Sequence, residues 1–157
     1  MKIKLLAIGK TDSKELQVLI DEYQKRLGFY IKFKFDMLPD IKKSKNLSEE
    51  QQKQKEGDLL LSHLKPTDVL ILLDENGKQM DSVRFALYLQ KHMISGIKQL
   101  VFVIGGPYGF SQDVYNKANG KISFSKMTFS HQMVRLFFVE QLYRGFTILK
   151  NEPYHHR

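Results

Sequence analysis

The chain has 157 residues, 42% of them hydrophobic and 27% charged, a composition typical of one globular domain with a sizeable core. It contains no cysteine, which excludes disulfide bonds and thiolate metal sites, and no apolar stretch long enough to span a bilayer. The apolar run near its start is too short for a secretory leader, so we expect a cytoplasmic protein without membrane association.

The formal net charge of +8 favours a polyanionic partner such as nucleic acid. The excess is uneven along the sequence. Residues 1–40 carry eight basic and six acidic side chains, and residues 41–80 carry seven of each. Residues 81–157 carry ten basic and four acidic side chains, so most of the positive charge is expected in the C-terminal half.

In the first half of the chain, apolar periodicity predicts alternating strands and helices. Two matches to a capping box predict helix starts. The elements expected here are a strand over 3–8, a helix from Asp12 and Glu15 to Lys25, a strand over 29–38, a helix from Ser48 and Gln51 towards His63, and a strand over 69–73.

The second half continues the alternation, with a turn at 75–78. The elements expected here are a helix over 82–94, a strand over 100–104, a short helix from Ser111, a strand over 122–124 and a long apolar helix from Met133 to about Ile148, capped by Ser130. Strands separated by helices require crossover connections. We therefore expect a single α/β domain over residues 1–157, with a mostly parallel sheet flanked by helices.

Three glycines follow the apolar strand 100–104, in the sequence Gly105-Gly106-Pro107-Tyr108-Gly109. Glycines at the carboxyl end of a strand allow backbone amides to approach a ligand closely. The segment matches neither the dinucleotide fingerprint nor the phosphate-binding loop. A tight strand-to-helix connection is the alternative interpretation.

Two further segments also follow predicted strands, namely Leu73-Asp74 and residues 123–129. A parallel sheet brings such segments to one edge, where Phe124, Met127 and Phe129 could line a cleft for a flat, uncharged ring. No lysine or serine is placed to handle phosphates, so an adenosine without phosphates is the favoured ligand. An ordinary loop before the Ser130 cap is the alternative.

The histidines do not predict a metal site. His155 and His156 are adjacent, which is poor ligand spacing, and neither cysteine nor a third ligand accompanies them. Tyr154, directly after Pro153, is more typical of a docked tail than of a disordered one. Histidine is also the side chain best suited to proton transfer near neutral pH.

Taken in order, four motifs resemble the bacterial RlmH (YbeA) family of SPOUT-class methyltransferases, over essentially the whole chain. They are Phe102–Gly109, Phe124–Arg135, Glu140–Arg144 and Pro153–His155. The resemblance implies a C-terminal trefoil knot, a homodimer, and S-adenosylmethionine (SAM) as methyl donor. It also implies methylation of N3 of a pseudouridine in helix 69 of 23S rRNA, within the assembled ribosome.

The same resemblance assigns roles to residues. Tyr154 and His155 would lie beside the methyl group, contributed across the dimer interface. Our own hypothesis is that His155 acts as the base and Tyr154 positions the target ring. His156 stands where relatives often have a basic residue, which leaves open whether it or Arg157 contacts phosphate. The expected SAM contacts are Leu73, Gly105, Phe124, Ser125, Lys126, Met127, Thr128 and Phe129, and the expected RNA contacts are Lys126, Arg135, Arg144 and Arg157.

Two other classes of function stay open. One is a non-catalytic ribosome- or RNA-binding module, which predicts salt-sensitive RNA binding but no SAM binding. The other is a nucleotide enzyme that handles phosphates, which the missing phosphate motifs disfavour.

Overall fold

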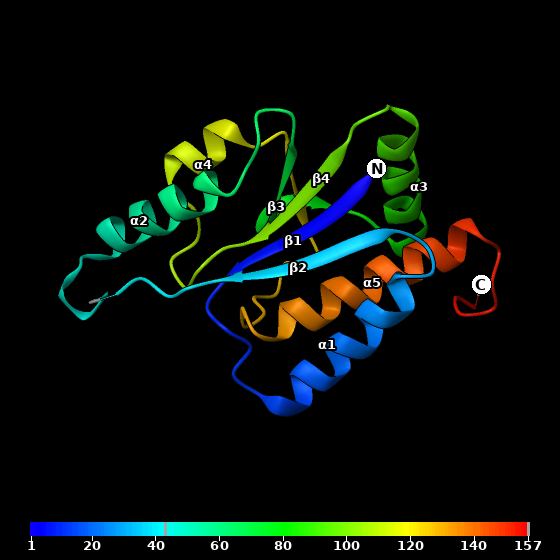
Figure 1. Cartoon of the computed structure of the whole chain (residues 1–157), viewed down its shortest axis with the longest axis horizontal. Helices are drawn as coiled ribbons and strands as arrows, with labels where there is room; N and C mark the ends of the chain where they lie inside the picture. The colour runs from blue at the N-terminus through cyan, green and yellow to red at the C-terminus, as the bar shows by residue number, and fades with distance from the viewer. Residues whose placement is uncertain (43, 157) are drawn as a thin grey trace.

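A computed structural model describes residues 1–42 and 44–156 of the chain. Its centre is one sheet of five parallel strands in the order β2-β1-β4-β3-β5 (Figure 1). The strands are β1 (Lys2–Ile8), β2 (Lys32–Leu38), β3 (Val69–Gln79), β4 (Gln99–Ile104) and β5 (Gly120–Ser123). The expected α/β class and parallel sheet are confirmed, whereas the trefoil knot stays a prediction.

Helices cover both faces of the sheet, with α1, α3 and α5 on one side and α2 and α4 on the other (Figure 1). The helices are α1 (Lys14–Leu27), α2 (Glu49–Ser62), α3 (Ser82–Ile94), α4 (Gln112–Lys117) and α5 (Met133–Leu149), with a short 3-10 turn at Ser44–Asn46. None of the helices in the described part of the chain is both long and apolar enough to cross a membrane.

In strand β1, the position of each apolar residue determines which of the two cores, one on each face of the sheet, contains its side chain. Ile3 and Leu5 are buried in the core beneath α1 and α5, whereas Leu6 and Ile8 are buried beneath α2 and α4. Successive side chains of a strand point to opposite faces, so a slip of one residue would exchange the two sets.

Two helix starts test the predicted capping boxes. The Ser48–Gln51 box is confirmed, since each side chain accepts a hydrogen bond from the other residue's backbone N–H. The start assigned to Asp12 is wrong by one residue. The cap of α1 is Ser13, whose Oγ accepts from the Leu16 N–H at 3.2 Å.

The turn predicted at 75–78 is wrong, because β3 continues through it to Gln79. Leu73 and Lys78 both pair with Ile122 of β5, so the residues between them form a bulge. A side chain at Gly77 would place its Cβ 2.5 Å from the carbonyl carbon of Ile122. Turn-forming residues thus occur inside a strand here, and the bulge aims polar groups at the carboxyl edge of the sheet.

Candidate active site

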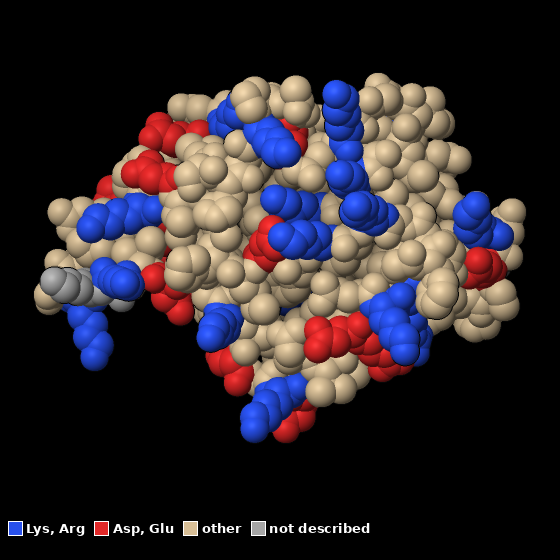
Figure 2. Space-filling view, viewed as in Figure 1, with Lys and Arg blue, Asp and Glu red and all other residues tan. Residues whose placement is uncertain are grey.

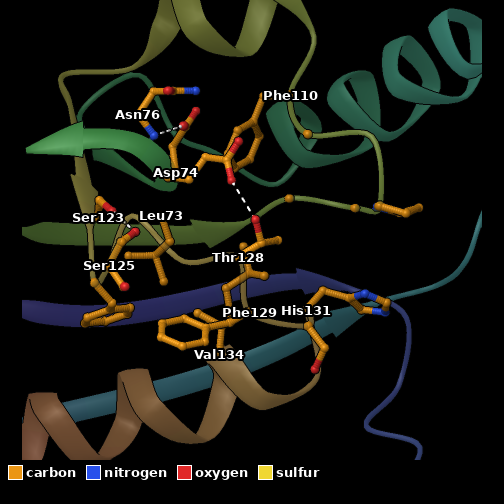
Figure 3. A pocket seen from close by; sticks show the side chains of 18 of the residues that line it. Leu73, Asp74, Asn76, Phe110, Ser123, Ser125, Thr128, Phe129, His131 and Val134 are labelled. Atoms are coloured by element: carbon orange, nitrogen blue, oxygen red, sulfur yellow. Dashed lines mark hydrogen bonds between the residues drawn. The ribbon is translucent and has the colours of Figure 1, made fainter.

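A cavity of about 700 Å³ opens at the carboxyl ends of β3, β4 and β5 (Figure 3). Its volume is within the usual range of small-molecule sites. The three segments singled out in the sequence all line it. Seven of the eight residues expected to contact SAM are present: Leu73, Gly105, Phe124, Ser125, Met127, Thr128 and Phe129. The eighth, Lys126, is exposed and does not line the cavity.

The glycine turn forms one wall from its backbone. The Gly109 N–H donates to the Gly106 carbonyl at 3.1 Å, which closes the turn. A Cβ at Gly105 would lie 3.2 Å from the ring of Phe110, which is 6% exposed. A side chain at Gly105 would therefore press against this buried ring, and the ligand contact expected at Gly105 stays a prediction.

The opposite wall is the loop that follows β5, and hydroxyl groups hold it in place. Ser123 Oγ donates to the Ser125 carbonyl at 2.7 Å, and Ser125 Oγ accepts from the Met127 N–H at 2.9 Å. Thr128 Oγ1 donates to Glu75 at 3.1 Å and so ties the loop to the bulge of β3. The irregular segment thus has a defined path.

Two acidic residues, Asp74 and Glu75, lie at the rim of the cavity. Asp74 accepts from the Tyr115 hydroxyl at 2.5 Å and from the Asn76 N–H at 2.8 Å. Burial, followed by the hydrogen bond to Asp74, raises the pKa of Tyr115, so the phenol stays protonated. Asp74 and Glu75 line the cavity, and no lysine or arginine of the described chain does. This lining disfavours a phosphate ligand and suits a cationic one.

A buried carboxyl lies behind the glycine turn, within the helix predicted from Ser48 towards His63. Glu56 of α2 is 3% exposed, and its Oε1 accepts from Gln52 Nε2 at 3.0 Å. Its Oε2 has no hydrogen-bond partner in the described chain and would collide with any side chain at Gly106. The available signal was the adjacent Gly57, because a glycine inside a helix often marks close packing.

Burial raises the pKa of Glu56 above its usual 4.5, so the folded protein favours the neutral carboxyl. The stability this provides is present at low pH and is lost as pH rises through the raised pKa. We expect Glu56→Gln to match wild type near pH 4 and to exceed its free energy of unfolding by about 1–2 kcal/mol near pH 8. Urea unfolding at both pH values measures this, and a constant difference would contradict it.

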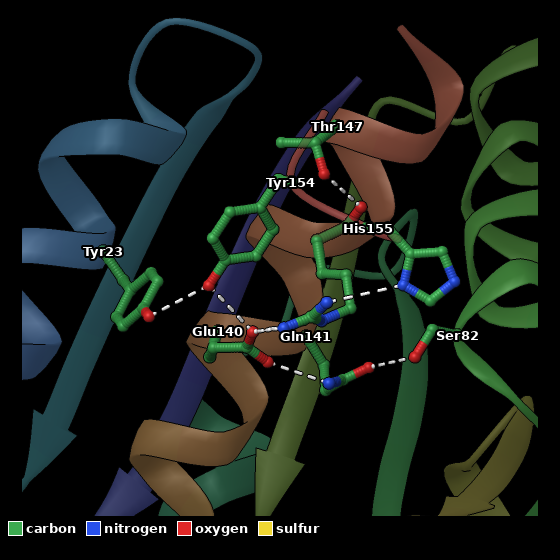
Figure 4. A network of polar contacts seen from close by, with 8 residues as sticks. Tyr23, Ser82, Glu140, Gln141, Thr147, Tyr154 and His155 are labelled. Carbon is green, nitrogen blue, oxygen red and sulfur yellow. Dashed lines mark hydrogen bonds and ion pairs between the residues drawn. The ribbon is translucent and has the colours of Figure 1, made fainter. Parts of the chain in front are cut away.

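At the other end of α5, the tail is docked in a polar network (Figure 4). Tyr154 donates to Glu140 Oε1 at 3.0 Å, and its oxygen lies 3.1 Å from that of Tyr23. Burial, helped by both hydrogen bonds, raises the pKa of Tyr154. Arg144 pairs with Glu140 at 2.5 Å and lies over the Tyr154 ring at 4.6 Å. The expectation of a docked tail is confirmed for the described residues.

His155 contacts Arg144 in this network. Arg144 Nη1 is 3.4 Å from His155 Nδ1, and a guanidinium can only donate, so Nδ1 accepts. His155 Nε2 is buried and has no partner in the described chain.

One protomer does not bring this tail to the cavity. Val134, near the start of α5, lines the cavity, whereas Tyr154 and His155 follow the end of the helix. A helix of 17 residues is about 25 Å long. The two parts of the expected site therefore lie at opposite ends of α5.

The residues expected to contact RNA differ in how far their side chains are exposed to solvent. Lys126 is exposed, whereas Arg144 is half-buried in the tail network. Arg157 lies outside the described residues. The expectation for Arg135 needs correction, because it is 0% exposed and donates to the carbonyls of Ile8 at 2.8 Å and Gly9 at 3.0 Å. Its guanidinium closes the loop after β1 and has no access to a phosphate.

In the part of the chain that the structure describes, no three His, Cys, Asp or Glu side chains are grouped so that they could hold a metal ion.

Comparison with known proteins agrees with this architecture. The family model described as "Predicted SPOUT methyltransferase" matches residues 1–155. Ribosomal RNA large subunit methyltransferase H of Flavobacterium psychrophilum is 73% identical, and that of Flavobacterium johnsoniae is 71% identical, each over the full length of both chains.

Among solved structures, a probable methylase family protein from Haemophilus influenzae has a TM-score of 0.52 at 9% identity. The match covers 99% of this chain and 70% of that one, and at this identity it supports the fold alone. The family model, which spans the cavity and the tail alike, decides the assignment. The chain belongs to the SPOUT methyltransferase family.

Proposed function

We propose that the protein methylates N3 of a pseudouridine in helix 69 of 23S rRNA, in the assembled ribosome in the cytoplasm, with SAM as methyl donor. The relatives named as large-subunit rRNA methyltransferases support the substrate class. The observation that carries the proposal is the cavity, which brings together three segments of a methyltransferase chain and is lined by carboxylates but by no lysine or arginine of the described residues.

The residues present suit this cofactor. Bound SAM supplies an electrophilic methyl group on a positively charged sulfur. Gly105 lines the cavity with backbone alone, and the side chains of Phe124 and Phe129 offer apolar surface to an adenine. The rim carboxylates, Asp74 and Glu75, suit the positive charge of the ligand.

The acceptor nitrogen carries a proton that a base must remove, and His155 is the proposed base. The contact with Arg144 implies a tautomer whose lone pair is on Nδ1. We therefore place proton uptake at Nδ1, after Arg144 turns to an RNA phosphate. Tyr154, held by Glu140 and Tyr23, would orient the target ring.

A second copy of the chain must supply the tail, because one protomer keeps it about 25 Å from the cavity. Exposed apolar side chains beside the cavity support a homodimer through this face: Tyr108, Met127, Phe129, Met133 and Phe137. Two α5 helices running in opposite directions would place each tail at the partner's cavity. We retain the trefoil knot as part of this proposal, because family membership supports it.

The dimer can be tested at Phe137, whose ring is 38% exposed and lies 5.1 Å from that of Phe129. We expect Phe137→Asp to give folded monomers, because it places a charge in an apolar interface. Light scattering after size exclusion measures the mass. Val18→Asp on α1, at 66% exposure, is the control for a charge on another exposed apolar position. A Phe137→Asp protein that stays dimeric contradicts this interface.

Calorimetric titration with SAM and with its demethylated product tests the function. Binding of both, followed by transfer of labelled methyl groups to ribosomes in preference to naked rRNA, is the expected result. RNA binding without SAM binding would instead identify a non-catalytic module. Binding of nucleoside triphosphates instead of SAM would identify the phosphate-handling alternative.

A further inference from the structure

Four lysines form a patch on one face of the two neighbouring strands β1 and β2. The parallel register pairs Lys2 with Lys32 and Lys4 with Lys34. Registered residues of neighbouring strands point to the same face, so the four side chains form two rows about 6.6 Å apart along the strands. We call these four residues the lysine patch. Figure 2 shows basic side chains gathered over this part of the sheet, with little acidic charge among them.

The lysine patch is open because helices cover only part of this face. Leu6 and Ile8, further along β1, and Leu38, at the end of β2, are buried in the core beneath α2 and α4. That cover does not extend to the amino-terminal halves of the two strands, where Lys2 and Lys32 are exposed and the side chain of Lys34 is 71% exposed. A parallel sheet normally has both faces covered, so this bare area is unusual.

The positive charge is only partly neutralised within the protein. Asp36 is the one carboxylate of the described chain within ion-pair distance, at 2.7 Å from Lys34 and 3.5 Å from Lys4. The carboxyl of Asp68 is nearby, but its hydrogen bonds are with other groups: it accepts from the Lys65 N–H and from Gln99. Like charges directly opposite each other on a sheet are destabilising, so folding alone does not explain the arrangement.

Protection of a sheet edge against aggregation can explain only the two lysines of β2. Lysines on an edge strand discourage aggregation, and β2 is an edge strand. Strand β1, however, is paired on both sides, with β2 and β4. Lys2 and Lys4 therefore protect no edge.

We propose that the lysine patch binds the sugar–phosphate backbone of RNA, as an anchoring surface separate from the cavity. The patch lies at the amino-terminal halves of the strands, and the cavity opens at their carboxyl ends. A strand of seven residues spans about 23 Å. Within one protomer the patch is therefore separate from the cavity. Lysines bind phosphates as point charges without reading sequence, so the patch governs affinity and leaves the chemical step unchanged.

The test uses a triple variant, Lys2→Gln with Lys32→Gln and Lys34→Gln, which leaves the Lys4–Asp36 pair in place. We expect the Kd for a hairpin RNA to rise about tenfold or more at low salt. The slope of log K against log salt should fall by about two to three, one for each phosphate that the variant no longer binds. The kcat with ribosomes and the affinity for SAM should match wild type.

Two matched variants make this result specific. Lys55→Gln with Lys91→Gln and Lys117→Gln removes the same charge from exposed positions on three helices, and it should weaken RNA binding far less. Replacing the three patch lysines by arginine should restore binding. Thermal melting of each variant verifies the fold.

The proposal of an anchoring surface is contradicted if both glutamine variants weaken RNA binding equally, or if neither variant weakens it. It is also overturned if the patch variant binds hairpin RNA normally but loses affinity for ribosomes, since the patch would then dock on a ribosomal protein. The proposal rests on the proposed function for the identity of the RNA. RNA binding is measured without SAM. If wild type failed to bind SAM, the proposed function would be contradicted, but the RNA-binding comparison would still decide whether the lysine patch binds RNA.

Discussion

Replacing Gly105 by valine is expected to lower the affinity for SAM at least about a hundredfold, or about 2.7 kcal/mol, while the fold survives. A Cβ at this position would lie 3.2 Å from Cζ of Phe110 and 3.4 Å from the carbonyl carbon of Gly109. Phe110 is buried and cannot retreat freely. Because Phe110 and Gly109 both line the cavity, we expect the added methyl groups to disturb the space proposed for the cofactor.

Calorimetry with SAM measures this effect, and circular dichroism with thermal melting verifies the fold. Gly28→Val is the matched control, because Gly28 lies in a right-handed helical conformation at the end of α1. The control should bind SAM as wild type does. Unchanged affinity in a folded Gly105→Val protein would place the cofactor elsewhere.

The largest effect on turnover is expected from His155→Ala. Removing a general base typically slows the chemical step about 10²- to 10⁴-fold, and we expect that loss in kcat at saturating SAM and ribosomes. SAM affinity should change little, because the proposed cofactor contacts come from the cavity lining, whereas His155 is proposed to act on the acceptor nitrogen.

Two further variants separate this role from a structural one. Tyr154→Phe keeps the ring and removes the hydroxyl that donates to Glu140, so it should lower kcat less than His155→Ala does. His63→Ala changes a histidine at the end of α2 and should behave as wild type. A His155→Ala enzyme with near wild-type turnover would eliminate His155 as the base.

The sequence was sufficient to predict the position of the cavity. Apolar runs mark β3 and β4, and the residues after a parallel strand must lie at the carboxyl edge of the sheet. Leu73, Gly105 and the 123–129 segment therefore meet where the alternation of strands and helices placed them. The bulge in β3 could not be predicted, because residues 75–78 have the local signature of a turn and only pairing with β5 keeps them in the strand.

Burial of polar groups was the least predictable feature. Arg135 has the same formal charge as a surface arginine, yet its guanidinium donates hydrogen bonds to backbone carbonyls that are distant in sequence. Glu56 lies in a charge-balanced segment typical of a solvated helix, yet it is buried and lies against Gly106. Both depend on contacts between distant parts of the chain, which periodicity does not encode.

Summed charge was also an incomplete guide. Residues 1–40 carry only a small positive excess, so the charge count predicts a basic surface in the C-terminal half. The register between β1 and β2 nevertheless gathers four lysines on one face. Several acidic residues that offset them in the count, including Glu15, Asp21 and Glu22, belong to α1, which covers the other face.

The central claim is that a cavity of one protomer works with the tail of its partner, and complementation tests it most directly. Gly105→Val has a defective cavity and an intact tail, and His155→Ala has the reverse. When equal amounts are unfolded and refolded together, half of the dimers are mixed, and each mixed dimer has one intact site. The account predicts recovery of about a quarter of wild-type methylation of ribosomes. A mixture as inactive as either variant alone, with mixed dimers shown to be present, would contradict it.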